Sequence, residues 1–155
     1  MTAPMQGHVD GGVHHFPIRV YYEDTDAAGI VYYANYLKFA ERARTEMMRC
    51  LGVEHATMRR EDGVFLAVRR ATIDYLGPAR LDDELQVTTR MVGAAGATVS
   101  LAQEVRRGDT VLARLELLIA CLTTAGRPCR PPPAIAAALA KISGKDQAMV
   151  TAHAH

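Results

Sequence analysis

The sequence contains no long, uninterrupted apolar run. Its longest apolar stretch, from Leu115 to Leu122, is broken by Glu116, whereas a helix that crosses a membrane needs about 20 predominantly apolar residues in a row. Residues 1–15 have neither the basic start nor the apolar centre of a signal peptide. We therefore predict a cytoplasmic protein without a membrane span, and we interpret the apolar stretch as a buried strand.

Net charge and cysteine are both scarce. The chain has 18 Lys and Arg residues against 17 Asp and Glu, a formal net charge of +1, so the basic surface typical of a nucleic-acid-binding protein is not expected. The three cysteines, Cys50, Cys121 and Cys129, are odd in number and include no short-spaced pair. This argues against a disulfide framework or a structural zinc site and favours reduced thiols in the cytoplasm.

A chain of 155 residues predicts one domain. Residues 1–13 are rich in Gly and polar side chains and lack periodicity, so we expect them to be disordered. We also expect a flexible tail at 144–155, which leaves a single domain over 14–143. His14 and His15 do not indicate a metal site, because neighbouring side chains on a strand point to opposite faces and their spacing fits no ligand pattern.

Hydrophobic periodicity predicts one long helix, over 35–51. Its apolar positions recur at helical spacing, at Tyr36, Ala40, Ala43, Met47, Cys50 and Leu51. Asn35 is predicted to cap its first turn and Gly52 to end it. A shorter helix is predicted over 54–60, and an Ala-rich helix over 134–142.

Alternating apolar and polar residues predict strands on both sides of the long helix. The expected strands cover 16–23, 64–75, 85–92, 97–106 and 111–123. One strand, a long helix and then four strands indicate an α+β domain, in which the helix lies across an antiparallel sheet. One helix leaves an edge and part of one face of this five-stranded sheet bare, so we expect a second copy of the chain to cover them.

The segment 21–36 places two aspartates, Asp24 and Asp26, in a turn just before the long helix. The N-terminus of a helix offers unpaired N–H groups and a partial positive charge, which can stabilise a carbonyl oxygen that gains negative charge during acyl transfer. A nearby carboxylate can attack that carbonyl or activate a water, and Gly29 lets the backbone approach a substrate closely. Spacing alone leaves a second interpretation open, in which each aspartate only forms the turn or caps the helix.

The same segment resembles the signature of the 4-hydroxybenzoyl-CoA thioesterase family. The resemblance rests on the pattern Tyr22-x-x-x-Asp26-x-x-Gly29-Ile30-Val31-Tyr32-x-x-Asn35-Tyr36-Leu37, followed by Glu41-Arg42-Ala43-Arg44, and on Tyr75-x-x-Pro78-Ala79. It is strongest to the branch of acyl-CoA thioesterases associated with the bacterial Tol–Pal system. The resemblance implies a hotdog fold, a five-stranded antiparallel sheet wrapped around one long central helix. It also implies dimers, often paired again into tetramers, with the active site at the subunit interface.

The resemblance assigns roles in the hydrolysis of an acyl-CoA to a free acid and CoA. Asp26 matches the family's catalytic aspartate, as nucleophile or general base, Tyr22 matches a tyrosine beside it, and the Tyr33 N–H matches the group that polarises the thioester carbonyl. No metal or other cofactor is implied, because CoA arrives with the substrate. The branch commonly carries a histidine where this chain has Tyr33, so a proton shuttle is missing and the pH dependence should differ.

Two groups of residues are expected to bind the substrate. The first is in the motif and the second consists of loop arginines suited to the phosphates of CoA: Gly29, Ile30, Val31 and Asn35, then Arg80, Arg127 and Arg130. Plain solvation is the alternative for each arginine.

Other chemistries remain open at this point. Glu41 or Glu46 on the long helix could serve as the base in place of Asp26, although Glu41 is also placed to pair with Arg44. A hydroxyacyl-thioester dehydratase of the same fold would need a histidine beside its acidic residue, and the motif has none. A non-catalytic acyl-CoA binding protein is the third candidate. The preferred acyl chain, and the choice between CoA and acyl-carrier-protein thioesters, are open.

Overall fold

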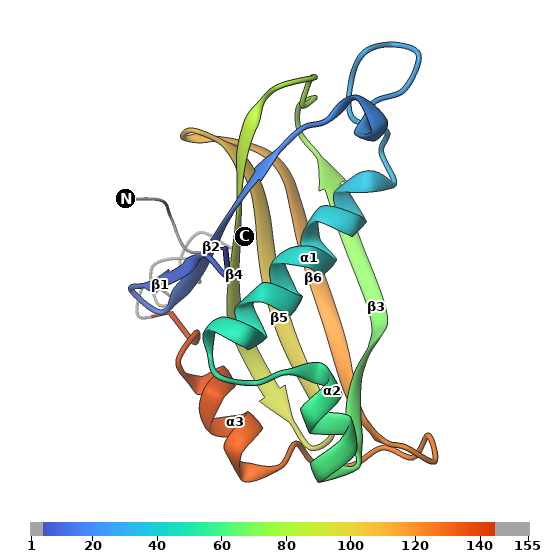
Figure 1. The fold of residues 1–155 in the computed structure, drawn as a ribbon, viewed down its shortest axis with the longest axis vertical. Coiled ribbons are helices and arrows are strands. Elements are labelled where there is room, and N and C mark those ends of the chain that lie inside the picture. Colours follow the sequence, from blue (N-terminus) through green and yellow to red (C-terminus); the bar gives the residue numbers. More distant parts are fainter. Residues whose placement is uncertain (1–4, 145–155) are drawn as a thin grey trace.

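Six antiparallel strands form a sheet that curves around one long helix (Figure 1). The structure is a computed structural model and describes residues 5–144. The strands are β1 (His8–Asp10), β2 (Val13–Arg19), β3 (Val64–Tyr75), β4 (Glu84–Ala95), β5 (Thr98–Arg107) and β6 (Thr110–Thr123). They lie in the order β1-β2-β4-β5-β6-β3. The helical elements are η1 (Tyr22–Asp24), α1 (Asn35–Cys50), α2 (His55–Thr57), η2 (Met58–Asp62) and α3 (Pro133–Ala140).

The predicted helix forms, as α1, and four residues of the predicted stripe are buried against the sheet: Tyr36, Ala40, Ala43 and Met47. Phe39 and Met48 are also buried, whereas Cys50 and Leu51 of the predicted stripe are only partly buried. Gly52 ends it with φ +87°, and the Gly52 and Val53 N–H groups donate to Arg49 and Met48 carbonyls at 2.9 and 2.8 Å. This pattern of C-terminal bonds needs the left-handed conformation that glycine adopts without strain.

The start of α1 differs from the prediction. Ala34 occupies the capping position and makes no side-chain cap bond. Asn35 is the first helical residue, and its side-chain amide donates to the Asp24 carbonyl at 2.9 Å. The predicted capping role of Asn35 is therefore wrong, because the amide is used to tie the helix to the preceding turn.

The strand predictions hold within a few residues for β3 to β6, and the inner face alternates as expected. A buried polar group interrupts this apolar face. Gln103 donates to the Ala40 carbonyl at 3.0 Å and to the Thr89 hydroxyl at 2.9 Å, and it accepts from Arg44 at 3.0 Å. Arg44 thus donates to Gln103, and no ion pair of Arg44 with Glu41 within 4.0 Å is found among the described residues.

The first strand lies earlier than predicted, and a strand precedes it. β1 pairs with β2 inside the segment expected to be disordered, so that expectation is wrong for residues 8–13. The glycine-rich composition was interpreted as disorder, but Gly11 and Gly12 both have positive φ and form the tight turn between β1 and β2. The prediction for a flexible tail falls, apart from residue 144, outside the described residues.

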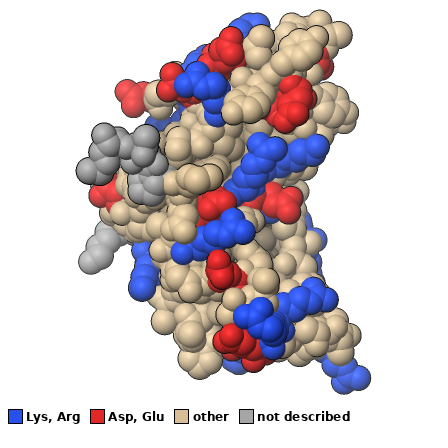
Figure 2. All heavy atoms as spheres, viewed as in Figure 1, with Lys and Arg blue, Asp and Glu red and all other residues tan. Residues whose placement is uncertain are grey.

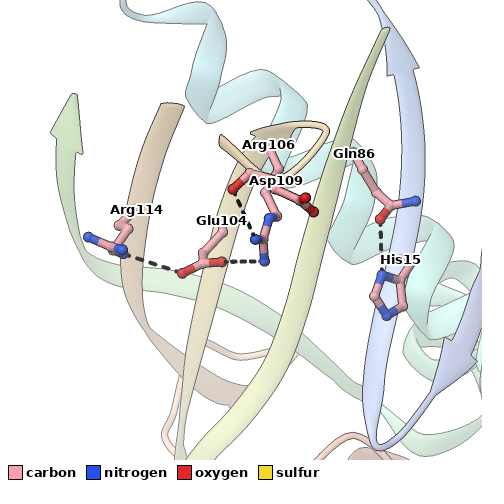
Figure 3. A network of polar contacts seen from close by, with 6 residues as sticks. All are labelled: His15, Gln86, Glu104, Arg106, Asp109 and Arg114. Carbon is pink, nitrogen blue, oxygen red and sulfur yellow. Dashed lines mark hydrogen bonds and ion pairs between the residues drawn. The ribbon is translucent and has the colours of Figure 1, made fainter. Parts of the chain in front are cut away.

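The outer face of the sheet is polar. Glu104 lies between Arg106 and Arg114, with separations of 3.2 and 3.3 Å (Figure 3). On the face that carries α1, basic and acidic side chains alternate (Figure 2), which agrees with the low net charge. None of the helices within residues 5–144 is both long and apolar enough to cross a membrane.

His14 introduces a pH dependence into this fold. Its ring is fully buried, Nε2–H donates to the Gln6 carbonyl at 2.6 Å, and Nδ1 has no partner among the described residues. Burial lowers the His14 pKa, and nearby His15 and His8 lower it further against the opposing effects of the Gln6 bond and Glu46. The ring is therefore held neutral in the folded chain.

We expect the free energy of unfolding to fall as the pH drops below about 6.5, the His14 pKa in the unfolded chain. Below this pH the unfolded state binds a proton at His14 that the folded state does not bind. The free energy of unfolding then falls by up to about 1.4 kcal/mol per pH unit. The loss ends once the pH is below the lowered folded pKa. Urea unfolding between pH 7.5 and 5.5 measures it. His14→Gln should flatten the dependence, whereas His8→Gln, at an exposed site whose charge is a lesser cause of the His14 shift than burial, should weaken it much less. Equal slopes in all three proteins would contradict this assignment.

Candidate active site

Asp26 lies at the base of a small loop that leads from η1 to α1. The Asp26 N–H donates to the Ile30 carbonyl and the Gly29 N–H donates to the Asp26 carbonyl, both at 2.9 Å. The Asp26 carboxylate accepts the Ala28 N–H at 2.8 Å and is otherwise exposed. Gly29 has φ +81°, so the loop closes in a conformation that a side chain would strain. The loop thus holds the carboxylate in place while leaving it open to a substrate.

Asp24 has the structural role that spacing alone allowed for either aspartate. It is buried, and its carboxylate accepts the Tyr21 N–H at 2.8 Å. Its carbonyl accepts the Tyr32 N–H and the Asn35 side chain, both at 2.9 Å. Asp24 therefore builds the turn, and Asp26 is the aspartate that remains available for chemistry.

The Tyr33 N–H lies just before the first turn of α1, as predicted. Within residues 5–144 it takes part in no backbone hydrogen bond, so it is available to a ligand. The Tyr33 side chain is 62% exposed and Tyr22 is 82% exposed. No hydrogen bond joins the Tyr22 hydroxyl to Asp26 among the described residues, and the Tyr22 carbonyl instead accepts the Thr25 hydroxyl at 2.7 Å.

Tyr75, at the end of β3, contacts the candidate site and was not among the predicted site residues. Its hydroxyl donates to the Tyr33 carbonyl at 2.9 Å, and its ring lies 6.2 Å from that of Tyr33 and 5.5 Å from that of Tyr36. Burial raises the Tyr75 pKa, and the neighbouring tyrosines add to this, so the hydroxyl stays a donor. The sequence signal for Tyr75 was the motif Tyr75-x-x-Pro78-Ala79 in the family resemblance, but the resemblance assigned no role to this tyrosine.

Replacing Tyr75 by Phe should loosen the start of α1 without removing a reacting group. We expect kcat/KM for thioester hydrolysis to fall by about 2- to 10-fold, because one hydrogen bond contributes about 0.5–1.5 kcal/mol. Steady-state kinetics measure this, with Tyr21→Phe, an exposed tyrosine nearby, as the matched control. A loss beyond about 100-fold would instead make the Tyr75 hydroxyl a catalytic group.

The predicted substrate residues separate into two places. Ile30 forms a bridge with Arg80, and the Val31 N–H donates to the Ala79 carbonyl at 2.8 Å, so Arg80 lies beside the Asp26 loop. Arg127 and Arg130 follow β6, whose end at Thr123 pairs with the start of β3. That is the opposite end of β3 from Tyr75, so one chain does not bring these two arginines to Asp26.

A cavity of about 650 Å³ lies beside the C-terminal half of α1, which forms part of its lining. Its apolar wall includes Met47, Leu66, Leu101, Ile119 and Leu139, and its polar part includes Glu41, Arg44, Arg49, Glu54 and His55. Burial lowers the pKa of Arg44, and burial followed by the fields of Arg49 and Arg44 lowers that of His55. His55 is therefore neutral near pH 7. The cavity lining includes none of the residues of the Asp26 loop.

Fold and site together define a thioesterase-like protein, and comparison with known proteins agrees. Residues 20–139 match the Thioesterase-like superfamily. The chain is 44% identical to Acyl-CoA thioesterase YbgC of Haemophilus influenzae over 69% of this chain and 79% of that protein. It is 42% identical to Acyl-CoA thioester hydrolase YbgC of Escherichia coli over 69% and 80%.

Solved structures show the same fold. A probable thioesterase from Bartonella henselae superposes with a TM-score of 0.75 at 35% identity, covering 77% of this chain and 99% of that one. The chain belongs to the Thioesterase-like superfamily. The predicted family resemblance and hotdog fold are confirmed, with six strands in place of five.

Proposed function

We propose that the chain hydrolyses an acyl-CoA thioester to a free carboxylic acid and CoA, with Asp26 as the catalytic carboxylate. The observation that carries the proposal is an exposed carboxylate on a closed loop, in a segment that continues to an uncommitted N–H at the start of a 16-residue helix. The YbgC relatives, named as acyl-CoA thioesterases, support the same reaction.

The proposed chemistry needs only water and the thioester. The thioester carbonyl accepts the Tyr33 N–H, and the positive end of α1 stabilises the negative charge that develops on its oxygen. The Asp26 carboxylate either takes a proton from an attacking water or attacks the carbonyl carbon itself. In the second route, CoA leaves as a thiolate and water hydrolyses the resulting anhydride, which regenerates the carboxylate. We propose that Arg80, which lies beside the Asp26 loop, binds a phosphate of CoA.

Release of free thiol from short, long and aromatic acyl-CoAs tests this proposal. We expect hydrolysis of at least one class, and the panel then identifies the acyl preference. A hydroxyacyl-CoA belongs in the panel, because loss of water from it without thiol release would indicate the dehydratase. Tight binding without turnover of any member would indicate a binding protein, and either result would overturn the proposal.

We further propose that the active form is a homodimer, in which a second copy pairs along β3. β3 is an edge of the sheet, and Val68 in its middle is 47% exposed. An edge with unpaired backbone groups and an exposed apolar side chain favours pairing with another strand. A mass of twice the 16.9 kDa of one chain by light scattering would support the dimer, and four times would support a tetramer. A monomer would contradict both.

We place the protein in the cytoplasm, in keeping with an acyl-CoA substrate and with its free cysteines. The association with the Tol–Pal system stays a prediction from the family resemblance.

A further inference from the structure

Two cysteines that lie eight residues apart in sequence meet at the end of β6. The Sγ atoms of Cys121 and Cys129 lie 3.6 Å apart. After β6 the chain turns and runs back beside it, with the Thr123 N–H donating to the Arg127 carbonyl at 2.7 Å and the Cys129 N–H donating to the Cys121 carbonyl at 2.9 Å. These bonds flank a bridge between Leu122 and Pro128, so the two cysteines lie opposite each other on antiparallel segments.

This placement allows a disulfide, although the spacing of the cysteines in the sequence argued against one. Opposite residues of antiparallel segments have Cα atoms about 4.5–5.5 Å apart, within the range of about 4.4–6.8 Å that a disulfide bridges. The sulfur atoms need to approach by about 1.5 Å to reach the bond length of about 2.05 Å, which side-chain rotation can supply. The third cysteine, Cys50, lies on α1 and takes no part.

The two thiols differ in access. Cys121 is 1% exposed and belongs to the core, whereas Cys129 is partly buried and packs against that core. Burial and then the contact with Cys129 raise the Cys121 pKa to about 12, so Cys121 rarely exists as the reactive thiolate. An oxidant from solution therefore meets Cys129 first, and Cys121 reacts only with the sulfur beside it.

We propose that Cys121 and Cys129 form a redox modification site that hydrogen peroxide converts to an intramolecular disulfide. The Cys129 sulfur attacks one peroxide oxygen and becomes a sulfenic acid, with loss of a water. The Cys121 sulfur then attacks the Cys129 sulfur, the S–S bond forms and a second water leaves. Two thiols lose two electrons in total, and one peroxide is reduced to two waters. A dithiol reductant reverses the step by exchange.

The disulfide would lie next to the wall of the cavity beside α1 and would stiffen the chain there. Cys121 pairs in register with Leu66 of β3, and Leu66, Ile119 of β6 and Leu139 of α3 all line that cavity. Closing the ring ties the segment 122–128, which leads from β6 towards α3, to the end of the strand. Because the crosslink limits the unfolded chain, the oxidised protein is expected to melt at a higher temperature.

Thiol counting on the full chain tests the site. After treatment with stoichiometric hydrogen peroxide, thiols measured in denaturant should fall from three to one, the intact mass should fall by two hydrogen atoms, and digestion should yield a peptide linking Cys121 to Cys129. Dithiothreitol should restore all three thiols and the original melting temperature. The Cys50→Ser variant should fall from two thiols to none, through the same linked peptide.

Two further variants show whether loss of the disulfide reflects the missing thiol or a variant that does not fold. Cys129→Ser, at the more exposed position, and Cys121→Ala, in the core, should both form no intramolecular disulfide while keeping the melting temperature of the reduced protein within a few degrees. Oxidation of Cys129 to a sulfinic acid with Cys121 still a thiol would overturn the proposal. Crosslinking through Cys50, or no loss of thiol while a control thiol reacts, would overturn it as well.

Discussion

Replacing Asp26 by Asn is expected to lower the rate of thioester hydrolysis by at least about 100-fold, as loss of a catalytic acid–base group does. The amide has nearly the shape of the carboxylate, and its oxygen can still accept the Ala28 N–H at the 2.8 Å seen in the native loop. The fold of the loop should therefore survive. What is lost is the negative charge that attacks the carbonyl or takes a proton from water. Thiol release under saturating substrate measures the change.

Two controls give this loss its meaning. Glu41→Gln removes one of the two rival carboxylates of α1, Glu41 being exposed and lining the cavity, and activity should stay within a few-fold of native. The Asp26→Asn protein should also melt within a few degrees of native. If Asp26→Asn retained activity and Glu41→Gln abolished it, the catalytic base would be on the helix, and the assignment of Asp26 would be wrong.

Replacing Phe39 by Ala is expected to cost the fold about 3–5 kcal/mol, as emptying a core aromatic site does. Phe39 is 0% exposed and its ring lies 6.1 Å from that of Tyr36, at the centre of the contact between α1 and the sheet. Since domains of this kind are stable by about 5–15 kcal/mol, the variant would lose a large share of its stability. Urea unfolding measures the loss.

Leu37→Ala is the matched control for the core substitution, because Leu37 lies on the same helix but is 40% exposed. It should lower the free energy of unfolding by clearly less than Phe39→Ala. Similar losses at both positions would mean that Leu37 is covered in solution, as by a second copy of the chain. A loss below about 1 kcal/mol for Phe39→Ala would contradict the packing of α1 described above.

Periodicity was sufficient to predict the central architecture. The stripe of Tyr36, Ala40, Ala43 and Met47 located α1 to within one residue, and Gly52 ended it, because burial of one helix face leaves a direct mark on sequence. The predicted strand over 64–75 coincides with β3. β1 was missed because a three-residue strand has too few positions to alternate, and because its order comes from pairing with β2.

A candidate site could be predicted where a motif was long, and not where contacts cross the fold. The roles predicted for Asp26 and the Tyr33 N–H come from a resemblance that spans the whole loop, and they stay predictions. Tyr75 is 42 residues from Tyr33, whose carbonyl accepts its hydrogen bond, and no local sequence pattern predicts a bond over that separation. The same limit hid the Cys121–Cys129 contact, since a turn between two segments sets the distance between the thiols and their spacing in sequence does not.

The geometry of a bound substrate analogue tests the account most directly. A crystal structure with an acyl-CoA analogue, in which a methylene group inserted between sulfur and carbonyl blocks hydrolysis, would locate the carbonyl. The account predicts its oxygen at about 2.7–3.1 Å from the Tyr33 nitrogen, with an Asp26 carboxylate oxygen, or a water held by it, about 3–3.5 Å from the carbonyl carbon. A carbonyl bound beside Glu41, away from the Asp26 loop, would contradict it.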